Sequence, residues 1–377
     1  MASITLTATT DVHGFIDEGL ANIMTVSKQL SADLLIDNGD FFVGSPFATF
    51  GFTQTKVSPL VDIANELAYD VMVPGNHDLD FGLNWLQTQV EALNADYICA
   101  NLKDATGQLV FPTYSLRSIK GVQVAVIGLM TAAFNQLCPP AVAQEVIVDD
   151  PFVALEATLK EVRAVGADFV VVAYHGGLTN NPVNGDTWFY PSLEDQAYQL
   201  LEAFPSIDSL ICGHQHFTQV AIHPENIAFL QVGTRAHHLG YQQFNVTEFK
   251  TEIVHNQLID LKNTSYPIAS DISNAYQMWL SQAIDLQVIQ KYIQTHYPAD
   301  LYLVNFTAAT LDELLQEIKQ PFPLSLYYLP GSELHSFTEN VEEHRFYQVL
   351  AITGMFPNFR LRQQFLISLF DEIIQNH

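Results

Sequence analysis

The sequence predicts an α/β protein in which short strands alternate with helices. Over most of the chain, β-branched and apolar runs alternate with segments whose apolar residues recur at helical spacing. Five of the runs end directly in clusters of Asp, Asn and His. The pattern changes beyond about residue 260, and 377 residues are enough for two hydrophobic cores. We therefore expect a larger domain over 1–260, a linker over 261–270 and a smaller α+β domain over 271–377.

The predicted strands are short and mostly apolar. They cover 3–9, 34–36, 71–73, 97–99, 114–119, 122–127, 169–173 and 207–212, with further strands at 220–232 and 241–254. Lys120-Gly121 lies between two of them and is typical of a hairpin turn. Helices separate most of the others, so we expect the polar clusters along one edge, where open α/β sheets bind ligands.

The predicted helices have apolar residues along one face. In the larger domain they cover 20–30, 57–67, 83–93, 152–165 and 193–204, and a loop rich in Gly and Phe follows residue 40. In the smaller domain we expect a long helix over 271–296, a strand over 301–304, and helices over 311–318 and 360–374.

The composition excludes several classes of function. The formal net charge of -26 disfavours binding to nucleic acid or to an anionic membrane. An anionic substrate would need local positive charge, which bound divalent cations can supply. The three cysteines are too scattered for a disulfide framework, and no apolar stretch is long enough for a membrane span. The N-terminal residues read as a strand and not as a leader, so we expect a cytoplasmic protein. The sequence does not indicate its oligomeric state.

The five clusters supply the ligand types that divalent metals prefer, namely carboxylate, amide oxygen and imidazole. The candidate ligands are Asp11, His13, Asp40, Asn76, His175, His214 and His216. Two pairs, Asp11 with His13 and His214 with His216, are spaced so that a turning backbone can direct both side chains at one ion. Asp40 is the natural bridging ligand, because one carboxylate can lie between two cations about 3.5–4 Å apart.

The neighbours of Asn76 suggest a catalytic pair. His77 is adjacent to Asn76, which turns its side chain away from the same metal and towards a bound substrate. Asp80 follows three residues later, where it can orient the imidazole and favour its protonated form. Asp78 is interpreted as a helix or turn cap.

Each cluster alone also has a plain structural explanation. A single Asp-x-His or Gly-His-x-His is often a surface turn, but five clusters in order at strand ends favour a metal site. Without such a context, we interpret the following as surface histidines: His223, His255, His296, His335, His344 and His377. His237 and His238 follow a strand near the last ligand pair, and both a site role and a plain turn remain open for them.

The motifs resemble those of the calcineurin-like metallophosphoesterases, and most closely the 5'-nucleotidase family, which includes 2',3'-cyclic-nucleotide phosphodiesterases and UDP-sugar hydrolases. The likeness covers about residues 4–246. It rests on Asp11-Val12-His13-Gly14, Asn38-Gly39-Asp40, Gly75-Asn76-His77-Asp78-Leu79-Asp80-Phe81-Gly82, Cys99-Ala100-Asn101-Leu102, Tyr174-His175-Gly176-Gly177 and Gly213-His214-Gln215-His216.

The resemblance implies a four-layered α/β/β/α sandwich with two divalent ions, for which Mn, Zn, Fe, Co and Ni all suit the ligand set. It assigns Asp11, His13, Asp40 and His216 to one ion, and Asp40, Asn76, His175 and His214 to the other. His77 with Asp80 is similar to the family's catalytic dyad. A metal-bound water would attack phosphorus in line, with no covalent enzyme intermediate.

The smaller domain departs from the family pattern. Residues 299–305 resemble the opening of an Asn-x-Gly-Gly-x-Arg motif, which makes Asn305 a candidate substrate-binding residue. Residues 306–310 then lack both glycines and the arginine. We therefore expect a reduced version of the nucleoside-binding C-terminal domain.

Three hypotheses for the function follow. The leading one is a dinuclear-metal-dependent phosphohydrolase that acts on a small-molecule phosphomonoester, as a 5'-nucleotidase does. The second keeps the chemistry but has a phosphodiester substrate, such as a 2',3'-cyclic nucleotide or a nucleotide-sugar. The third is a non-catalytic binding protein on the same fold, against which the complete set of ligands argues.

Overall fold

A computed structural model describes residues 2–134, 138, 142–247, 250–282, 301–303, 310, 312–313, 324–330, 346–352 and 361–365. The chain divides into two compact units, one of residues 1–43 and 55–267, the other of residues 44–54 and 268–377. The second unit thus takes in 44–54, which the sequence analysis placed inside the larger domain. The expected boundaries at 260 and 270 stay a prediction.

The first unit contains two six-stranded sheets. One sheet has the order β14-β13-β1-β2-β3-β4, formed by β1 (Ala2–Thr9), β2 (Leu34–Asp37), β3 (Val71–Met72), β4 (Asp96–Tyr97), β13 (His238–Val246) and β14 (Thr251–Asp260). Strands β1 to β4 are parallel to their neighbours in this series, whereas β13 runs antiparallel to β1. The carboxyl ends of β1, β2 and β3 therefore lie at one edge.

The second sheet has the order β11-β12-β10-β9-β7-β6. Its strands are β6 (Tyr114–Ile119), β7 (Val122–Met130), β9 (Phe169–His175), β10 (Ser209–Cys212), β11 (Thr218–Ile222) and β12 (Ala228–Val232). The middle strands are parallel, and β6 forms the expected hairpin with β7. A separate short ribbon pairs β5 (Leu102–Asp104) with β8 (Val146–Val148).

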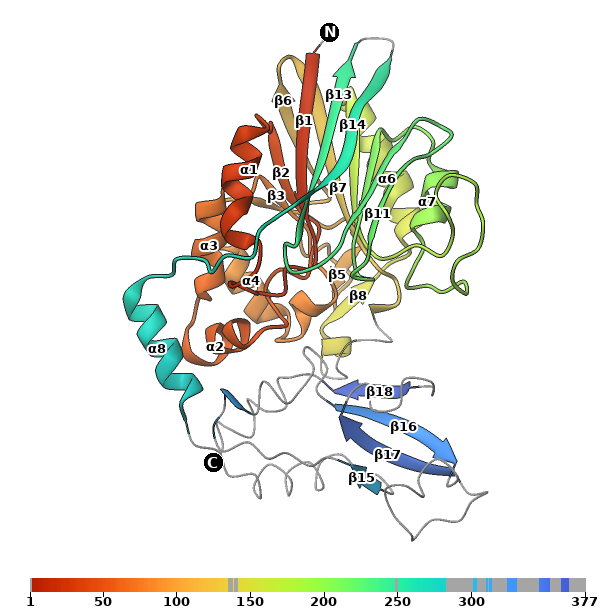
Figure 1. The fold of residues 1–377 in the computed structure, drawn as a ribbon. Helices are drawn as coiled ribbons and strands as arrows, with labels where there is room; N and C mark the ends of the chain where they lie inside the picture. The colour runs from red at the N-terminus through yellow and green to blue at the C-terminus, as the bar shows by residue number, and fades with distance from the viewer. Residues whose placement is uncertain are drawn as a thin grey trace. The chain divides into compact units, whose positions relative to one another are not determined.

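Helices cover the outer face of each sheet (Figure 1). Beside the first sheet lie α1 (Ile23–Gln29), α3 (Pro59–Leu67) and α4 (Leu83–Val90), and on the second lie α6 (Pro151–Ala164) and α7 (Ala197–Ala203). Short 3-10 helices form at η1 (Leu20–Asn22), η2 (His77–Leu79) and η3 (Val142–Gln144), the last of them directly before β8. Helix α6 begins where the Asp150 side chain accepts the backbone N–H groups of Phe152 and Val153, directly before Pro151.

Two hydrophobic cores result, and β9 separates them. Phe169, Val171 and Ala173 face the core between the two sheets. Val170 and Val172, which alternate with them, face the core under α6 and α7. A strand that is buried on both faces is expected to be apolar, as this one is from Phe169 to Ala173. The unit is thus a four-layered α/β/β/α sandwich, which confirms the fold implied by the resemblance.

The second unit combines helices with a four-stranded sheet of order β15-β17-β16-β18. Its elements are α2 (Pro46–Gln54), α8 (Ser270–Leu280), β15 (Leu301–Leu303), β16 (Leu324–Pro330), β17 (Phe346–Ile352) and β18 (Leu361–Phe365). Aromatic rings join the two helices: Phe50 lies 5.4 Å from Tyr276 and 5.8 Å from Trp279, measured between ring centroids.

Several expected elements were wrong or incomplete. The loop predicted after residue 40 contains helix α2, and each of the segments 220–232 and 241–254 includes parts of two strands joined by a turn. The predicted helix over 360–374 was wrong at 361–365, which form β18 paired with β16. Helix α8 ends at Leu280, and the rest of the predicted helix to 296 lies outside the described residues, as does most of 311–318. Among the described helices, none is long and apolar enough to cross a membrane.

Candidate metal centre

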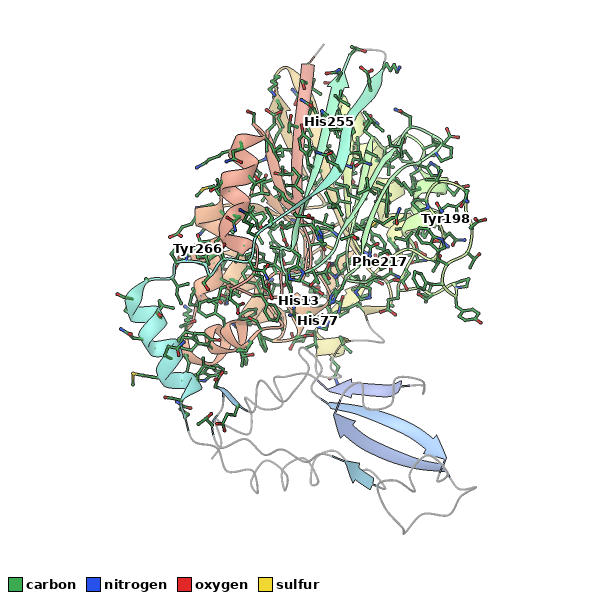
Figure 2. The ribbon with its side chains drawn as sticks, in the orientation of Figure 1. His13, His77, Tyr198, Phe217, His255 and Tyr266 are labelled. Carbon is green, nitrogen blue, oxygen red and sulfur yellow. The ribbon has the colours of Figure 1, made fainter. Side chains whose placement is uncertain are left out.

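The polar clusters meet where the strands of both sheets end. Figure 2 shows His13 and His77 together at this edge of the first unit, with their ring centroids 5.7 Å apart. Three contacts link residues from the two sheets: His13 Nε2 to His216 Nε2 at 2.9 Å, His175 Nε2 to Asp40 Oδ2 at 3.2 Å, and His214 Nδ1 to Asn76 Oδ1 at 2.8 Å. Asp11 joins them, because its Oδ1 lies 3.4 Å from His216 Nε2 and 4.0 Å from His175 Nε2. The structure thus brings together all seven predicted ligands.

The backbone at the strand ends is held in an uncommon conformation. Five of the candidate ligands have positive φ: Asp11 (52°), His13 (54°), Asp40 (55°), His214 (74°) and His216 (61°). Residues other than glycine rarely adopt such angles, and they persist where surrounding contacts fix them. Here the N–H of Asp11 donates to the Gly39 carbonyl (2.9 Å), and that of His13 donates to the Asp40 carbonyl (2.8 Å).

Two glycines allow the loops to approach this closely. A Cβ atom on Gly75 would lie 2.0 Å from Asp40 Oδ1, and one on Gly213 would lie 2.0 Å from Thr10 Oγ1. Both distances are far below a van der Waals contact. Any side chain at these two positions would therefore displace Asp40 or the segment that carries Asp11.

Backbone carbonyls orient two of the imidazoles. His13 Nδ1–H donates to the Val43 carbonyl, and His175 Nδ1–H donates to the Asn38 carbonyl, each at 2.7 Å. In the neutral ring this leaves the lone pair on Nε2, which points into the centre. Two buried atoms there have no hydrogen-bond partner, namely His175 Nε2 and Asp40 Oδ2. Buried polar groups of this kind are normally satisfied, and a cation would satisfy both.

The distances fit a shared divalent ion. Donor atoms about 2.1 Å from one ion and at right angles around it lie about 3 Å apart, close to the His13–His216 and His175–Asp40 separations. Two groups of side chains could hold a metal: Asp11 with His13 and His216, and Asp11 with Asp40 and His175. Asp11 Oδ1 thus reaches both groups, and Asp40 Oδ2 also lies 3.9 Å from His13 Nε2.

The electrostatics favour cation binding. Burial opposes ionisation of Asp40, but the nearby charges of His175 and His77 hold the pKa of its carboxyl well below the usual range. Burial lowers the pKa of His13 to about 4, so this ring is neutral at pH 7. A charged carboxylate beside a neutral imidazole is the protonation state that a metal requires. Burial opposes protonation of His175 as well, but the charge of Asp40 outweighs it and raises the pKa of this ring to about 10, so a bound cation would have to displace its proton.

His77 and Asp80 form the predicted pair. Nδ1 of His77 lies 2.7 Å from Asp80 Oδ2, and the backbone N–H of His77 donates to Asp40 Oδ1 at 2.8 Å. Burial opposes protonation of the ring, but the charges of Asp80 and Asp40 outweigh it and raise the pKa of His77 to about 9. The imidazole is therefore positively charged at pH 7, beside the candidate metal ligands.

The interpretation of Asp78 as a local cap was incomplete. Its fully buried carboxylate accepts three backbone N–H groups, from Gly75 (2.9 Å) in its own turn and from Asp40 and Phe42 (2.8 Å each) in the loop after β2. Asp78 therefore holds the loops after β2 and β3 together. Burial, assisted by the charge of Asp40, raises its pKa to about 7.

Two of the histidines interpreted as surface residues, His223 and His255, lie in the part of the chain that the structure describes. His223 was predicted at the surface, but it is buried and its Nε2 lies 2.9 Å from Glu202 Oε1. The prediction failed because the acidic partner is distant in sequence. His255 is exposed, at the opposite end of the sheets (Figure 2).

His237 and His238 contact carboxylates outside the ligand set, at Glu18 (3.2 Å) and Asp260 (3.3 Å). Five residues singled out in the sequence lie outside the described residues: His296, Asn305, His335, His344 and His377.

One contact was missed by the sequence analysis. Glu194 Oε1 lies 2.6 Å from His214 Nε2. Glu194 belongs to a loop before α7, and no local motif marks it as a partner of a residue twenty positions later.

Comparison with known proteins agrees with this geometry. Residues 4–217 match the model of the calcineurin-like phosphoesterase family. A trifunctional nucleotide phosphoesterase of Bacillus subtilis is 24% identical over 246 residues, covering 56% of this chain and 16% of that protein. A 2',3'-cyclic-nucleotide 2'-phosphodiesterase/3'-nucleotidase of Haemophilus influenzae is 25% identical over 241 residues, covering 56% of this chain and 36% of that protein. The chain thus spans only a minor part of the length of these relatives.

The fold also has whole-chain counterparts. The crystal structure of a Staphylococcus aureus protein described as a 5'-nucleotidase matches with a TM-score of 0.76 and 20% sequence identity, over 100% of this chain and 97% of that one. At this identity the match bears on the fold alone. The family model covers more than half of the sequence, and its span contains all five polar clusters. The chain therefore belongs to the calcineurin-like phosphoesterase family.

Proposed function

We propose that this protein is a metal-dependent phosphohydrolase that uses two divalent ions. One ion would be held by Asp11, His13, Asp40 and His216, and the other by Asp40, Asn76, His175 and His214. The observation that carries the proposal is the set of donor atoms that face one another about 3 Å apart, all of them buried or half-buried except that of the exposed His216. Such an arrangement of lone pairs costs free energy unless a cation lies between them.

The chain's own residues have separate tasks in this proposal. When bound, the ions supply positive charge to the phosphoryl oxygens and lower the pKa of a coordinated water. Asp80 orients His77, and the charged imidazole stabilises negative charge on a phosphoryl oxygen or on the leaving group. Asp78 keeps the loops that carry Asp40 and His77 in register.

For the substrate, we propose a nucleotide phosphomonoester. The family match and relatives named as nucleotidases support a small phosphoester. A second candidate is a phosphodiester such as a 2',3'-cyclic nucleotide, because the Haemophilus relative bears that name. The same ligand set and dyad serve both reactions. The ions are proposed from Mn, Zn, Fe, Co and Ni, which all accept imidazole and carboxylate.

The first experiment measures phosphate release by the manganese-loaded protein. The panel contains nucleoside 5'-monophosphates, 2',3'-cyclic nucleotides, UDP-glucose and bis-p-nitrophenyl phosphate, with a coupled phosphatase that reveals diester cleavage. We expect the highest kcat/KM for a nucleoside monophosphate. Preference for the cyclic nucleotides would select the second candidate, and no turnover of any ester would select a non-catalytic binding protein.

The second experiment replaces His77 with Ala. We expect kcat to fall by about 10²–10⁴-fold, the usual contribution of a general acid or base, with metal content unchanged. The control is His255→Ala, which removes an exposed imidazole far from the centre. Turnover by His77→Ala equal to that of the control would refute the role of the dyad.

A further inference from the structure

Glu194 is a charged side chain that contacts a candidate ligand without belonging to the ligand set. Its Oε1 accepts a hydrogen bond from His214 Nε2–H at 2.6 Å. This distance is short even for a hydrogen bond to a charged group, which is usually about 2.7–2.9 Å long. The His214 side chain is 10% exposed and that of Glu194 is 38% exposed. The pair therefore lies at the border between the buried centre and solvent.

The backbone of Glu194 is fixed beside the same centre. Its carbonyl accepts hydrogen bonds from Thr131 Oγ1 (3.1 Å) and from the Tyr174 hydroxyl (3.4 Å). The N–H of Thr131 in turn donates to the carbonyl of His175 (2.9 Å), itself a candidate ligand. Glu194 is thus anchored to the ends of β7 and β9 and does not depend on the exposed part of its loop for its position.

The contact decides which nitrogen of His214 is available. Because Nε2 carries the proton that it donates to Glu194, the lone pair of the neutral ring is on Nδ1. That atom lies 2.8 Å from Asn76 Oδ1, which is also a lone-pair donor. The two atoms face each other as neighbouring ligands of one ion would. Rotation of the ring, or a proton on Nδ1, would remove this arrangement.

Glu194 differs from the groups that orient the other imidazoles. His13 and His175 donate to backbone carbonyls, which no side-chain substitution removes. His214 depends on a side chain, and a carboxylate also raises the basicity of the imidazole that it accepts from.

We infer that Glu194 is a positioning residue that sets the affinity of one of the two metal ions, the one held by Asn76 and His214. The inference rests on the proposed metal site and deepens it. It follows that the two ions differ in their dependence on this loop. Loss of Glu194 lowers the affinity for one ion and leaves the affinity for the ion at Asp11, His13 and His216 unchanged.

The test is calorimetric titration of the metal-free protein with Mn²⁺, which needs no substrate. We expect Glu194→Ala to raise the Kd of one ion by about 10–100-fold, the usual effect of removing such a partner, and to leave the other within about threefold of wild type. Glu194→Gln keeps the length of the side chain and one acceptor oxygen, so its effect should be smaller. If the alanine variant does not fold, the Mn²⁺ affinities of Glu194→Gln test the inference in its place.

The matched control is Glu202→Ala. Glu202 pairs with His223 at 2.9 Å as Glu194 pairs with His214, but this pair lies outside the ligand set. Mn²⁺ binding by the control should equal that of wild type. A variant of Glu194 with both Kd values unchanged, or with both weakened equally, would overturn the inference while the proposed function stands. Failure of wild type itself to bind two ions would overturn the metal site and the inference together.

Discussion

At the scale of single residues, the charge on His77 is maintained by two carboxylates that also serve other purposes. Asp80 contacts its Nδ1, and Asp40 accepts its backbone N–H while facing the candidate metal ligands. Burial alone would favour the neutral ring, so the charge depends on these anions. A substitution at either carboxylate should therefore be visible in the protonation of His77.

The first prediction concerns Asp80→Asn and the pH dependence of turnover. With a pKa of about 9, His77 is protonated up to mildly alkaline pH, and activity that needs the imidazolium declines as pH rises through that value. Removing the charge of Asp80 lowers this pKa, so the alkaline limb of the kcat profile should move to lower pH. An unchanged alkaline limb would show that another group controls it.

The raised pKa of His77 also makes the free energy of unfolding depend on pH. Because the folded-state pKa of His77 lies above its unfolded value, protonation of His77 contributes stability that is lost as pH rises through about 9. Burial raises the pKa of Asp80 to about 6, so below that pH the carboxyl is protonated and no longer pairs with the imidazolium. Urea denaturation of wild type and Asp80→Asn should therefore differ most near neutral pH, and converge above pH 9.

The second prediction concerns Asp78→Ala. The substitution leaves three buried N–H groups without their acceptor, and each such group costs about 1–3 kcal/mol. We expect the free energy of unfolding to fall by about 3–5 kcal/mol. Asp62→Asn, an exposed carboxylate in the first turn of α3, should change it by only a few tenths of a kcal/mol. Equal stability of both variants would mean that Asp78 does not hold the loops together.

At the scale of elements, helices α2 and α8 show how distant segments form one unit. Phe50 is 2% exposed and packs its ring against Tyr276 and Trp279 of α8. The sequence between α2 and α8 belongs almost entirely to the other unit. These aromatic contacts tie α2 to α8 within the second unit.

The third prediction tests this packing. Phe50→Ala should lower the free energy of unfolding of the second unit by about 3–5 kcal/mol, the usual cost of removing a buried aromatic ring. Met278→Ala is the control, because this side chain of α8 is 73% exposed. The measurement is the urea midpoint followed by tryptophan fluorescence. If the two variants shift the midpoint equally, the rings do not hold the helices together.

The elements were predictable where their signals are local. The strands that lead to the site carry dense apolar runs followed by polar clusters, and all of them form as expected. The segment 361–365 has Leu361 and Phe365 four residues apart, a spacing that suits a helix. In the structure it pairs with β16 instead, because strand formation depends on a partner that is remote in sequence. The segment 220–232 was misread because its apolar residues continue on both sides of a turn.

The residues of the site also divide into those with a local sequence signal and those that depend on remote partners. The ligand types and the dyad were visible as motifs, since each motif is local and follows a strand. The N–H groups of Asp40 and Phe42 that Asp78 binds, and the contact of Glu194 with His214, join segments that only the fold brings together. Residues that hold the site in position were therefore missed, whereas residues proposed to perform the chemistry were found.

At the scale of the whole molecule, the net charge of -26 influences any cation that approaches. Such a charge raises the local concentration of divalent cations and repels anionic substrates, and salt screens both effects. Two bound divalent ions would also neutralise part of this net charge. They would reduce repulsion between the buried carboxylates as well.

The fourth prediction is that Mn²⁺ stabilises the fold. At a free concentration of 100 times Kd, each site should add about 2.7 kcal/mol to the free energy of unfolding, and a chelator should reverse the gain. NaCl at matched ionic strength is the control, because it screens the net charge without entering the site. If NaCl raised the urea midpoint as much as Mn²⁺, the effect would be screening and not binding.

The separation of His13 and His216 along the chain has a consequence in time. Their facing nitrogens are 203 positions apart in sequence. During synthesis, the first of these residues leaves the ribosome long before the second exists, and domains fold as their segments become complete. The facing pair can therefore form only after residue 216 has been made. A nascent chain that ends before this residue would lack the proposed metal centre.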